Sequence, residues 1–226
     1  MAKTIDDLFV YLRLITDVLI ICFFFSKRIA ISQKGFLLIA FYCIYDLVFY
    51  IIDSYILLPK DLVAIFYSSF TFIEYLTMAY FIWLFINNQI FKKFIFITSI
   101  AFVITLIIYL FFAEAKHIDS IPIGLETVLI LIFTFYYLYE QMNNVENDFL
   151  YTQFSFWAIT GFMVYLAGSF FIYVFAEQID KQIIFQYWFL TNAFYTLKNI
   201  LILIGLLLII RKLKNPHSKN LYSYLN

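Results

Sequence analysis

The sequence predicts an all-α, polytopic membrane protein built as a bundle of seven transmembrane helices. The chain has 226 residues, of which 65% are hydrophobic and only 13% are charged. Soluble domains average about 45–50% apolar and about 25% charged residues. The apolar residues also fall into seven long runs, and crossing a bilayer takes about 20 such residues in a helix. Short polar breaks separate the runs, so they belong to one bundle.

The seven predicted spans cover residues 7–25, 36–57, 62–86, 94–113, 121–139, 151–175 and 184–210. They form a single domain over 1–212, followed by a short cytoplasmic tail at 213–226. The first run is expected to stay in place as a helix because Asp6 and Asp7 make its front end acidic. A cleavable signal would begin with basic residues and end at a small-residue site. No catalytic domain of its own is expected.

The lysines and arginines of the short loops predict the orientation, since cytoplasmic loops carry the excess of cations. Nine lie on one side: Lys27, Arg28, Lys34, Lys92, Lys93, Arg211, Lys212, Lys214 and Lys219. Four lie on the other side: Lys3, Lys60, Lys116 and Lys181. The N-terminus is therefore expected outside and the C-terminus in the cytoplasm. The loop after the fifth span is acidic, which fits either a solvated loop or a docking surface for a partner.

The first span carries Arg13 and Asp17, four residues apart on one helix face. Residues at this spacing can form an ion pair within the helix. The second span carries a polar stripe at helical spacing, which is expected to face the bundle interior; its members are Tyr42, Asp46, Tyr50 and Asp53. The stripe is either a satisfied structural network or the lining of a pocket that is open to the outside.

The third span places Glu74 near the middle of the bilayer. A lone carboxylate in lipid is protonated unless it has a partner. Glu74 is thus expected to be neutral and hydrogen-bonded, or charged against Lys198 or Arg13.

The next three spans carry fewer ionisable groups. The fourth has none in its middle and is expected to be the most lipid-exposed helix. The fifth has only Glu126 near its outer end, and Tyr136, Tyr137 and Tyr139 at its inner end resemble an interfacial aromatic belt. In the sixth, small residues on one face predict a packing seam rather than a hinge; they include Ala158, Gly161 and Gly168.

The seventh span carries Lys198 near its middle. A cation at that depth costs at least roughly 2.5–3.5 kcal/mol, so it is expected to face protein or water and to have a partner. Other polar residues share its face: Thr191, Asn192, Tyr195 and Asn199. Spans one, two, three and seven are therefore predicted to enclose a buried charge network. Its expected members are Lys198, Glu74, Asp46, Asp53, Asp17 and Arg13.

Several classes of function lack a signal in the sequence. No motif of a metalloprotease, serine hydrolase or phosphate-binding loop is present, so an enzyme is not predicted. His117 and His217 lie apart in a loop and in the tail, and no metal site is predicted. The formal net charge is zero, which gives no basis for nucleic acid binding.

Three segments resemble a family of small seven-helix membrane proteins of Bacteroidota: FIEYLTMAYFIWLFINNQIFKK, FWAITGFMVYLAGSFFIYVFA and WFLTNAFYTLKNILILIGLL. The shared elements are Ile73-Glu74-Tyr75, the pattern from Phe156 to Phe170, and the stripe from Asn192 to Asn199. Proteins of this kind resemble the membrane input domains of histidine kinases. The resemblance implies a multi-pass protein of the bacterial inner membrane with a role in signal transduction, and a histidine kinase or another membrane protein as partner.

A second resemblance is to microbial rhodopsins, which also have seven spans, a lysine in the last helix and an acidic counter-ion in the third. Lys198 and Glu74 stand in matching places. This resemblance implies retinal as a cofactor, bound to Lys198. The chain departs from the rhodopsin pattern at Thr71, where an arginine is usual, and at Phe194, where an aspartate is common.

The sequence as a whole favours a sensor or signalling module without a cofactor. In this hypothesis an ion pair between Lys198 and Glu74 or Asp46 holds one helix arrangement, and a ligand, a proton or a partner shifts it. The alternative is a transporter of protons, cations or small molecules, because four intramembrane carboxyl groups could form a path. A purely structural subunit of a larger complex is also compatible with the polar stripes.

Overall fold

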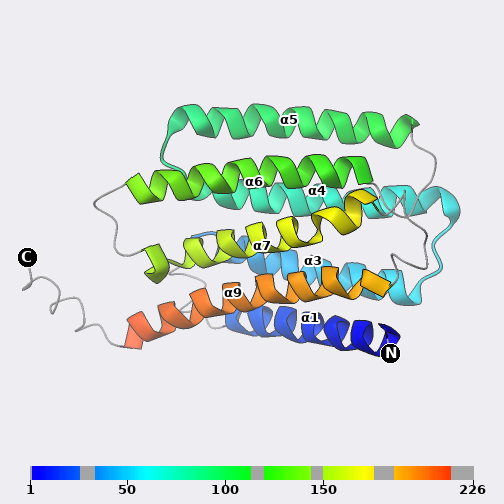
Figure 1. Ribbon diagram of the computed structural model, residues 1–226, viewed down its shortest axis with the longest axis horizontal. Helices are drawn as coiled ribbons and strands as arrows, with labels where there is room; N and C mark the ends of the chain where they lie inside the picture. Colours follow the sequence, from blue (N-terminus) through cyan, green and yellow to red (C-terminus); the bar gives the residue numbers. More distant parts are fainter. Residues whose placement is uncertain (1, 26–33, 113–119, 144–149, 176–185, 215–226) are drawn as a thin grey trace, which may run out of the picture.

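The computed structural model describes residues 2–25, 34–112, 120–143, 150–175 and 186–214 (Figure 1). These residues form seven long α-helices, one short 3-10 helix and no strand. The helices are α1 (Ala2–Phe24), α3 (Phe36–Tyr55), α4 (Lys60–Phe85), α5 (Gln89–Phe112), α6 (Ser120–Asn143), α7 (Phe154–Phe175) and α9 (Phe189–Lys214), and the 3-10 helix is η1 (Leu150–Thr152). The all-helical prediction is confirmed, and each helix lies over one of the seven predicted apolar segments.

Six of these helices, α3 to α9, are long and apolar enough to cross a membrane, so this is a multi-pass membrane protein by the character of its helices. The exception is α1. Every 18-residue stretch within it contains at least three charged residues, among them Asp7, Arg13 and Asp17. For α1 to lie in the bilayer, these charges must be satisfied by neighbouring helices.

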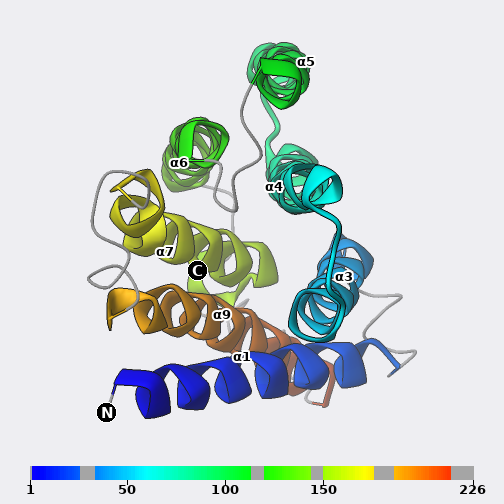
Figure 2. The ribbon, with the colours of Figure 1, turned by 90° about the vertical axis from the view of Figure 1, so that its right-hand side faces the viewer.

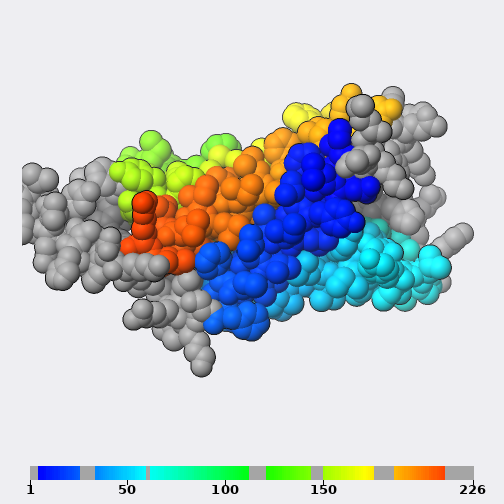
Figure 3. All heavy atoms as spheres, turned by 90° about the horizontal axis from the view of Figure 1, so that it is seen from below, coloured from blue at the N-terminus to red at the C-terminus, as the bar shows by residue number. Residues whose placement is uncertain are grey.

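The helices run alternately up and down, so the start of α1 and the end of α9 lie at opposite ends of the bundle (Figure 1). Viewed along the bundle, α9 lies between α1 and α7 (Figure 2). On the other side, α3 packs against α1, and α4 packs against α3. The adjacent packing of α1 and α9 is also visible on the surface seen in Figure 3. The loop cations Lys27, Arg28, Lys116, Lys181 and Lys219 lie outside the described residues, as do both histidines.

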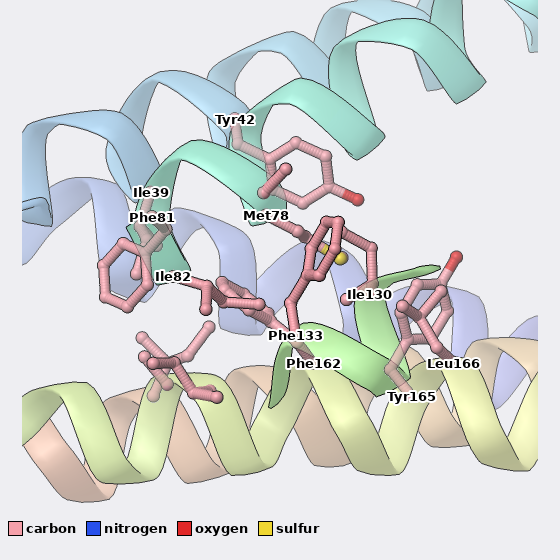
Figure 4. Close-up of a cluster of buried hydrophobic side chains, with 14 of the residues drawn as sticks. Ile39, Tyr42, Met78, Phe81, Ile82, Ile130, Phe133, Phe162, Tyr165 and Leu166 are labelled. Carbon is pink, nitrogen blue, oxygen red and sulfur yellow. The ribbon is translucent and has the colours of Figure 1, made fainter. Parts of the chain in front are cut away.

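The apolar core lies between α3, α4, α6 and α7. Figure 4 shows its side chains converging from these four helices, with the rings of Tyr42 and Tyr165 beside the aliphatic residues. By contrast, α5 packs only at the edge of the bundle (Figure 2). Its most apolar window is 17% buried, against 33–44% in the other five spans. Among these six spans α5 is therefore the one least covered by the rest of the protein, as expected for a lipid-exposed helix.

The helix connections explain where two elements begin. Gly35 precedes α3 with φ of +81°, in the left-handed region that glycine adopts without strain. Asn88 precedes α5, and its Oδ1 accepts the backbone N–H groups of Ile90 at 2.8 Å and Phe91 at 3.3 Å. This is an N-cap of the usual kind, which satisfies donors that the first helical turn leaves free.

The glycines of α7 form the predicted packing seam against α9. A Cβ at Gly161 would lie 3.0 Å from the carbonyl oxygen of Lys198, and one at Gly168 would lie 2.4 Å from the ring of Phe194. Both positions thus require the absence of a side chain for α7 and α9 to approach. The seam at Gly161 brings α7 directly against the backbone of Lys198.

We expect Gly161→Ala to lower the unfolding temperature in detergent, because the new methyl group meets backbone that cannot rotate away. Overpacking of this kind costs about 1–3 kcal/mol. The matched control is Gly124→Ala on α6, whose Cβ would meet only a methyl group of Val174 at 3.4 Å. Both alanines gain similar helix propensity, so equal unfolding temperatures for the two variants would contradict the seam.

Candidate functional site

The polar centre of the bundle begins at Arg13 of α1, which lies between α3 and α9. Its guanidinium donates to both carboxylate oxygens of Asp46 on α3, with Nε 3.1 Å from Oδ2. Its Nη1 donates to Oδ1 of Asn192 on α9 at 3.2 Å. Asp46 is fully buried, and the side chain of Arg13 is 18% exposed. This two-pronged ion pair fixes α1 against α3.

The ion pair predicted within α1, between Arg13 and Asp17, is not formed among the described residues. Arg13 reaches Asp46 instead, and Asp17 accepts a hydrogen bond from Nδ2 of Asn199 at 2.9 Å. The spacing of four residues allowed a local pair, but neighbouring helices provide better partners for both groups. Asp17 is fully buried, and its Oδ2 has no hydrogen-bond partner in the described part of the chain.

The two asparagines of α9 join it to α1 at two levels. Asn192 Nδ2 donates to Oδ1 of Asp6 at 3.1 Å, and Asn199 Nδ2 donates to Oγ1 of Thr16 at 3.0 Å as well as to Asp17. The two positions are seven residues apart, or about two helical turns, so they face the same neighbour. Within the polar stripe predicted on the last span, the two asparagines are thus the residues that bond to α1.

Glu74 of α4 accepts a hydrogen bond from the hydroxyl of Tyr42 on α3, and both side chains are buried. The sequence left a choice between hydrogen bonding and an ion pair with Lys198 or Arg13. In the described residues Glu74 has no cation within 4 Å, and Tyr42 is its partner. This bond connects α3 to α4 near the middle of the bundle.

Lys198 is fully buried, and its Nζ has no hydrogen-bond partner among the described residues. The ammonium instead lies over three tyrosine rings: 3.4 Å from the centre of Tyr195, 4.4 Å from Tyr42 and 5.1 Å from Tyr165. Such cation–π contacts are favourable, more so when water is excluded. The direct ion pair expected with Glu74 or Asp46 is not formed here, because these carboxylates bind Tyr42 and Arg13.

Tyr195 links the two buried cations. One is Lys198, and the other is Arg13, whose Cζ lies 4.1 Å from the same ring centre. The hydroxyl of Tyr195 is itself buried without a hydrogen-bond partner in the described part of the chain. The ring therefore contributes its electron-rich faces rather than its hydroxyl to this centre.

Three predicted site residues lie away from this centre. Asp53 is exposed near the end of α3, where it accepts a hydrogen bond from Tyr67 at 2.5 Å. Tyr50 is half-buried one turn beyond Asp46. Thr191 is buried, but its hydroxyl donates to the carbonyl of Trp188 at 2.7 Å. The second-span stripe therefore divides, with Tyr42 and Asp46 inside the polar centre and Tyr50 and Asp53 outside it.

Glu126 of α6 is a buried carboxyl group that the sequence placed near the end of its span. It is 1% exposed, and its Oε1 has no hydrogen-bond partner among the described residues. The signal for its burial was available, because Ile130, Phe133 and Tyr137 follow it at helical spacing and all three are fully buried. Tyr137 donates to Ser155 on α7 at 2.9 Å, so its assignment to an interfacial belt was wrong.

The acidic residue Glu140 has a structural role at the same end of the bundle as the start of α5. Its two carboxylate oxygens accept the backbone N–H groups of Asn87 and Asn88, each at 2.8 Å. The side chain of Asn88 also donates to Tyr136 at 2.7 Å. Glu140, one of the acidic residues predicted in the loop after the fifth span, thus stabilises the turn between α4 and α5. The other two, Glu146 and Asp148, lie outside the described residues.

No family model matches this chain, and no curated protein or solved structure shows significant similarity to it. The function of the site therefore has to be inferred from its geometry.

The interior of the bundle holds more acidic than basic side chains. The buried carboxyl groups of the described residues are Asp17, Asp46, Glu74 and Glu126, and the cations inside the bundle are Arg13 and Lys198. Two cations can neutralise only two carboxylates, and an isolated charge in a low-dielectric interior is costly. The remaining carboxyl groups are therefore suited to hold protons. The described residues contain no cluster of metal-ligating side chains.

We expect Arg13→Gln to destabilise the protein strongly, because it leaves the buried carboxylate of Asp46 without its counter-charge. Breaking one partner of a buried ion pair costs about 3–5 kcal/mol. Asp46→Asn is expected to cost less, since Arg13 is partly exposed and keeps Asn192. In the double variant, part of the loss is expected to be recovered. Unfolding temperatures in one detergent test this cycle, and strictly additive losses would contradict a direct pair.

Proposed function

We propose that this protein is a sensory or signalling module of the bacterial inner membrane, with seven transmembrane helices, the N-terminus outside and the C-terminus in the cytoplasm. The observation that carries the proposal is Lys198, a buried ammonium group with no hydrogen bond among the described residues. Intramembrane ionisable residues are retained where they have a function. The start of α1 and the end of α9 lie at opposite ends of the bundle, which supports an odd number of crossings (Figure 1).

The proposed mechanism is a change of partner for Lys198. In the arrangement described, its ammonium rests on tyrosine rings. Glu74 lies just beyond one of them, because it accepts the hydroxyl of Tyr42. Asp17 accepts a hydrogen bond from Asn199, the residue that follows Lys198 in the sequence. A small shift of α9 would replace a ring contact by an ion pair. A proton, a ligand or a partner that favours one arrangement would shift the population of helix positions.

The output is proposed to pass along α9, which carries Lys198 and ends at Lys214 on the proposed cytoplasmic side. A histidine kinase or another membrane signalling protein is the proposed receiver, as the Bacteroidota resemblance implies. Gly161 supports transmission, because it keeps α7 in contact with the backbone of Lys198. A displacement of α9 at this level would therefore also move α7.

Transport of protons or cations is the second candidate. Glu126 favours it, because it adds a further buried carboxyl group, on α6, with an oxygen that has no hydrogen-bond partner among the described residues. Retinal bound to Lys198 is less favoured by the geometry. The rings of Tyr42, Tyr165 and Tyr195 lie over the ammonium, and a polyene attached at Nζ would have to displace them.

The direct test of the signalling proposal is purification of the tagged protein from its own membranes in a gentle detergent, with mass spectrometry of the proteins that accompany it. We expect a histidine kinase or another signalling protein in stoichiometric amount. Recovery of the protein alone, combined with proton or cation flux in proteoliposomes, would replace signalling by transport. An absorption band in the visible range after addition of retinal would instead support the rhodopsin-like alternative.

We further expect Lys198→Met to change the amount of partner recovered, because it removes the ammonium group while keeping a side chain of similar length. It also leaves the buried carboxylates with one cation fewer, so a change in unfolding temperature is expected as well. The matched control is Leu197→Met, the adjacent residue on α9, which is 40% exposed on the outer surface of the bundle. Unchanged stability and unchanged partner recovery in Lys198→Met would contradict the proposed switch.

A further inference from the structure

A groove of about 680 Å³ runs between α4 and α5. It lies on the opposite face of α4 from Glu74, the residue that binds Tyr42 of α3. Its volume is in the range of sites that hold small ligands. Apolar side chains from the two helices line most of its length, namely Leu76, Ala79, Phe96, Ile100, Val103 and Ile104. It lies along α5, which is at the edge of the bundle and is the least buried of the six helices long and apolar enough to cross a membrane (Figure 2).

One end of this groove is cationic. Lys92 and Lys93 line it at the start of α5, together with Gln89 and Trp83. The ammonium of Lys92 lies 4.7 Å from the centre of the Trp83 ring, and Trp83 stacks on Tyr80 at 5.7 Å. Tryptophan and tyrosine are typical of the level of the lipid headgroups. The cationic end therefore lies where headgroups are expected.

The two lysines have no anionic partner within the described residues. The one ion pair described in the chain joins Arg13 to Asp46, far from α5. Glu140, the carboxylate at this end of α5, is already held by two backbone N–H groups. The groove is apolar along most of its length and ends in two cations without an anionic partner. These features fit a ligand that has apolar chains and an anionic headgroup.

We propose that the α4–α5 groove binds an anionic phospholipid of the leaflet at the Lys92 end, with its phosphate at Lys92 and Lys93 and an acyl chain along Ala79, Ile100 and Val103. This inference does not rest on the signalling proposal. It requires only that α4 and α5 lie in a membrane, which their length and hydropathy support. The charge at one end and the apolar lining along the rest distinguish a lipid from a transmembrane helix of a partner.

The test is native mass spectrometry of the detergent-purified full chain with dioleoyl phosphatidylglycerol or dioleoyl phosphatidylcholine added. We expect the wild type to retain the anionic lipid preferentially. The variant Lys92→Gln/Lys93→Gln is expected to bind phosphatidylglycerol at least fivefold more weakly, which is about 1 kcal/mol, the value of a single basic residue at an anionic surface. The matched control is Arg211→Gln, an exposed cation of α9 at the same end of the bundle.

A second pair of variants tests the apolar part without changing charge. Val103→Phe is expected to fill the groove and weaken binding of phosphatidylglycerol, whereas Ile107→Phe, one turn further along α5 and exposed, is expected to leave it unchanged. The proposal would be overturned if the wild type bound phosphatidylglycerol and phosphatidylcholine equally. It would also be overturned if Arg211→Gln lost as much phosphatidylglycerol binding as Lys92→Gln/Lys93→Gln, or if Val103→Phe kept full binding. A dimer lost in Val103→Phe, with lipid binding unchanged, would assign the groove to a second copy of the chain.

Discussion

The structure depends on the ion pair between Arg13 and Asp46. Of the seven helices, α1 is the one whose composition alone does not suit a membrane, because its charges are spread along its length. It can lie against the bundle because α3 supplies a carboxylate for Arg13 and α9 supplies amides at Asn192 and Asn199. A buried ion pair adds little to stability, but it is very sensitive to the loss of either partner. It therefore specifies which helices α1 contacts.

The second constraint is the placement of two cations around one ring. Arg13 and Lys198 both lie over Tyr195, at 4.1 Å and 3.4 Å from its centre. Two like charges this close repel each other, and more strongly where water is excluded. The nearby carboxyl groups of Asp17, Asp46 and Glu74 offset this repulsion. In the proposed mechanism, a proton added to or removed from these acids changes this balance of charge between α1 and α9.

Hydropathy was sufficient to predict the helices, because a run of about 20 apolar residues has few alternatives to a membrane helix. The ionisable residues within these runs also predicted that α1, α3, α4 and α9 would supply the polar centre. The partners of individual groups were not predictable in the same way. Arg13 prefers Asp46 to the local Asp17, and Lys198 prefers tyrosine rings to a carboxylate. These choices depend on distances between helices, which the spacing along one helix does not contain. Glu126 was not included in the predicted charge network, and Tyr137 was assigned to an interfacial belt, because position within a span does not determine burial.

The helix α4 connects the polar centre to the lipid-facing side of the bundle. Glu74 accepts the hydroxyl of Tyr42 on one side, and the next residue, Tyr75, lies 2.9 Å from Ser99 on α5 through its hydroxyl. Ser99 lines the groove, as does Leu76. An occupant that separates α4 from α5 would act first on the Tyr75–Ser99 contact, one residue away from Glu74, the carboxyl group that is hydrogen-bonded to Tyr42. Coupling requires an element with two arrangements that both sites influence, and α4 is the described helix that contacts both.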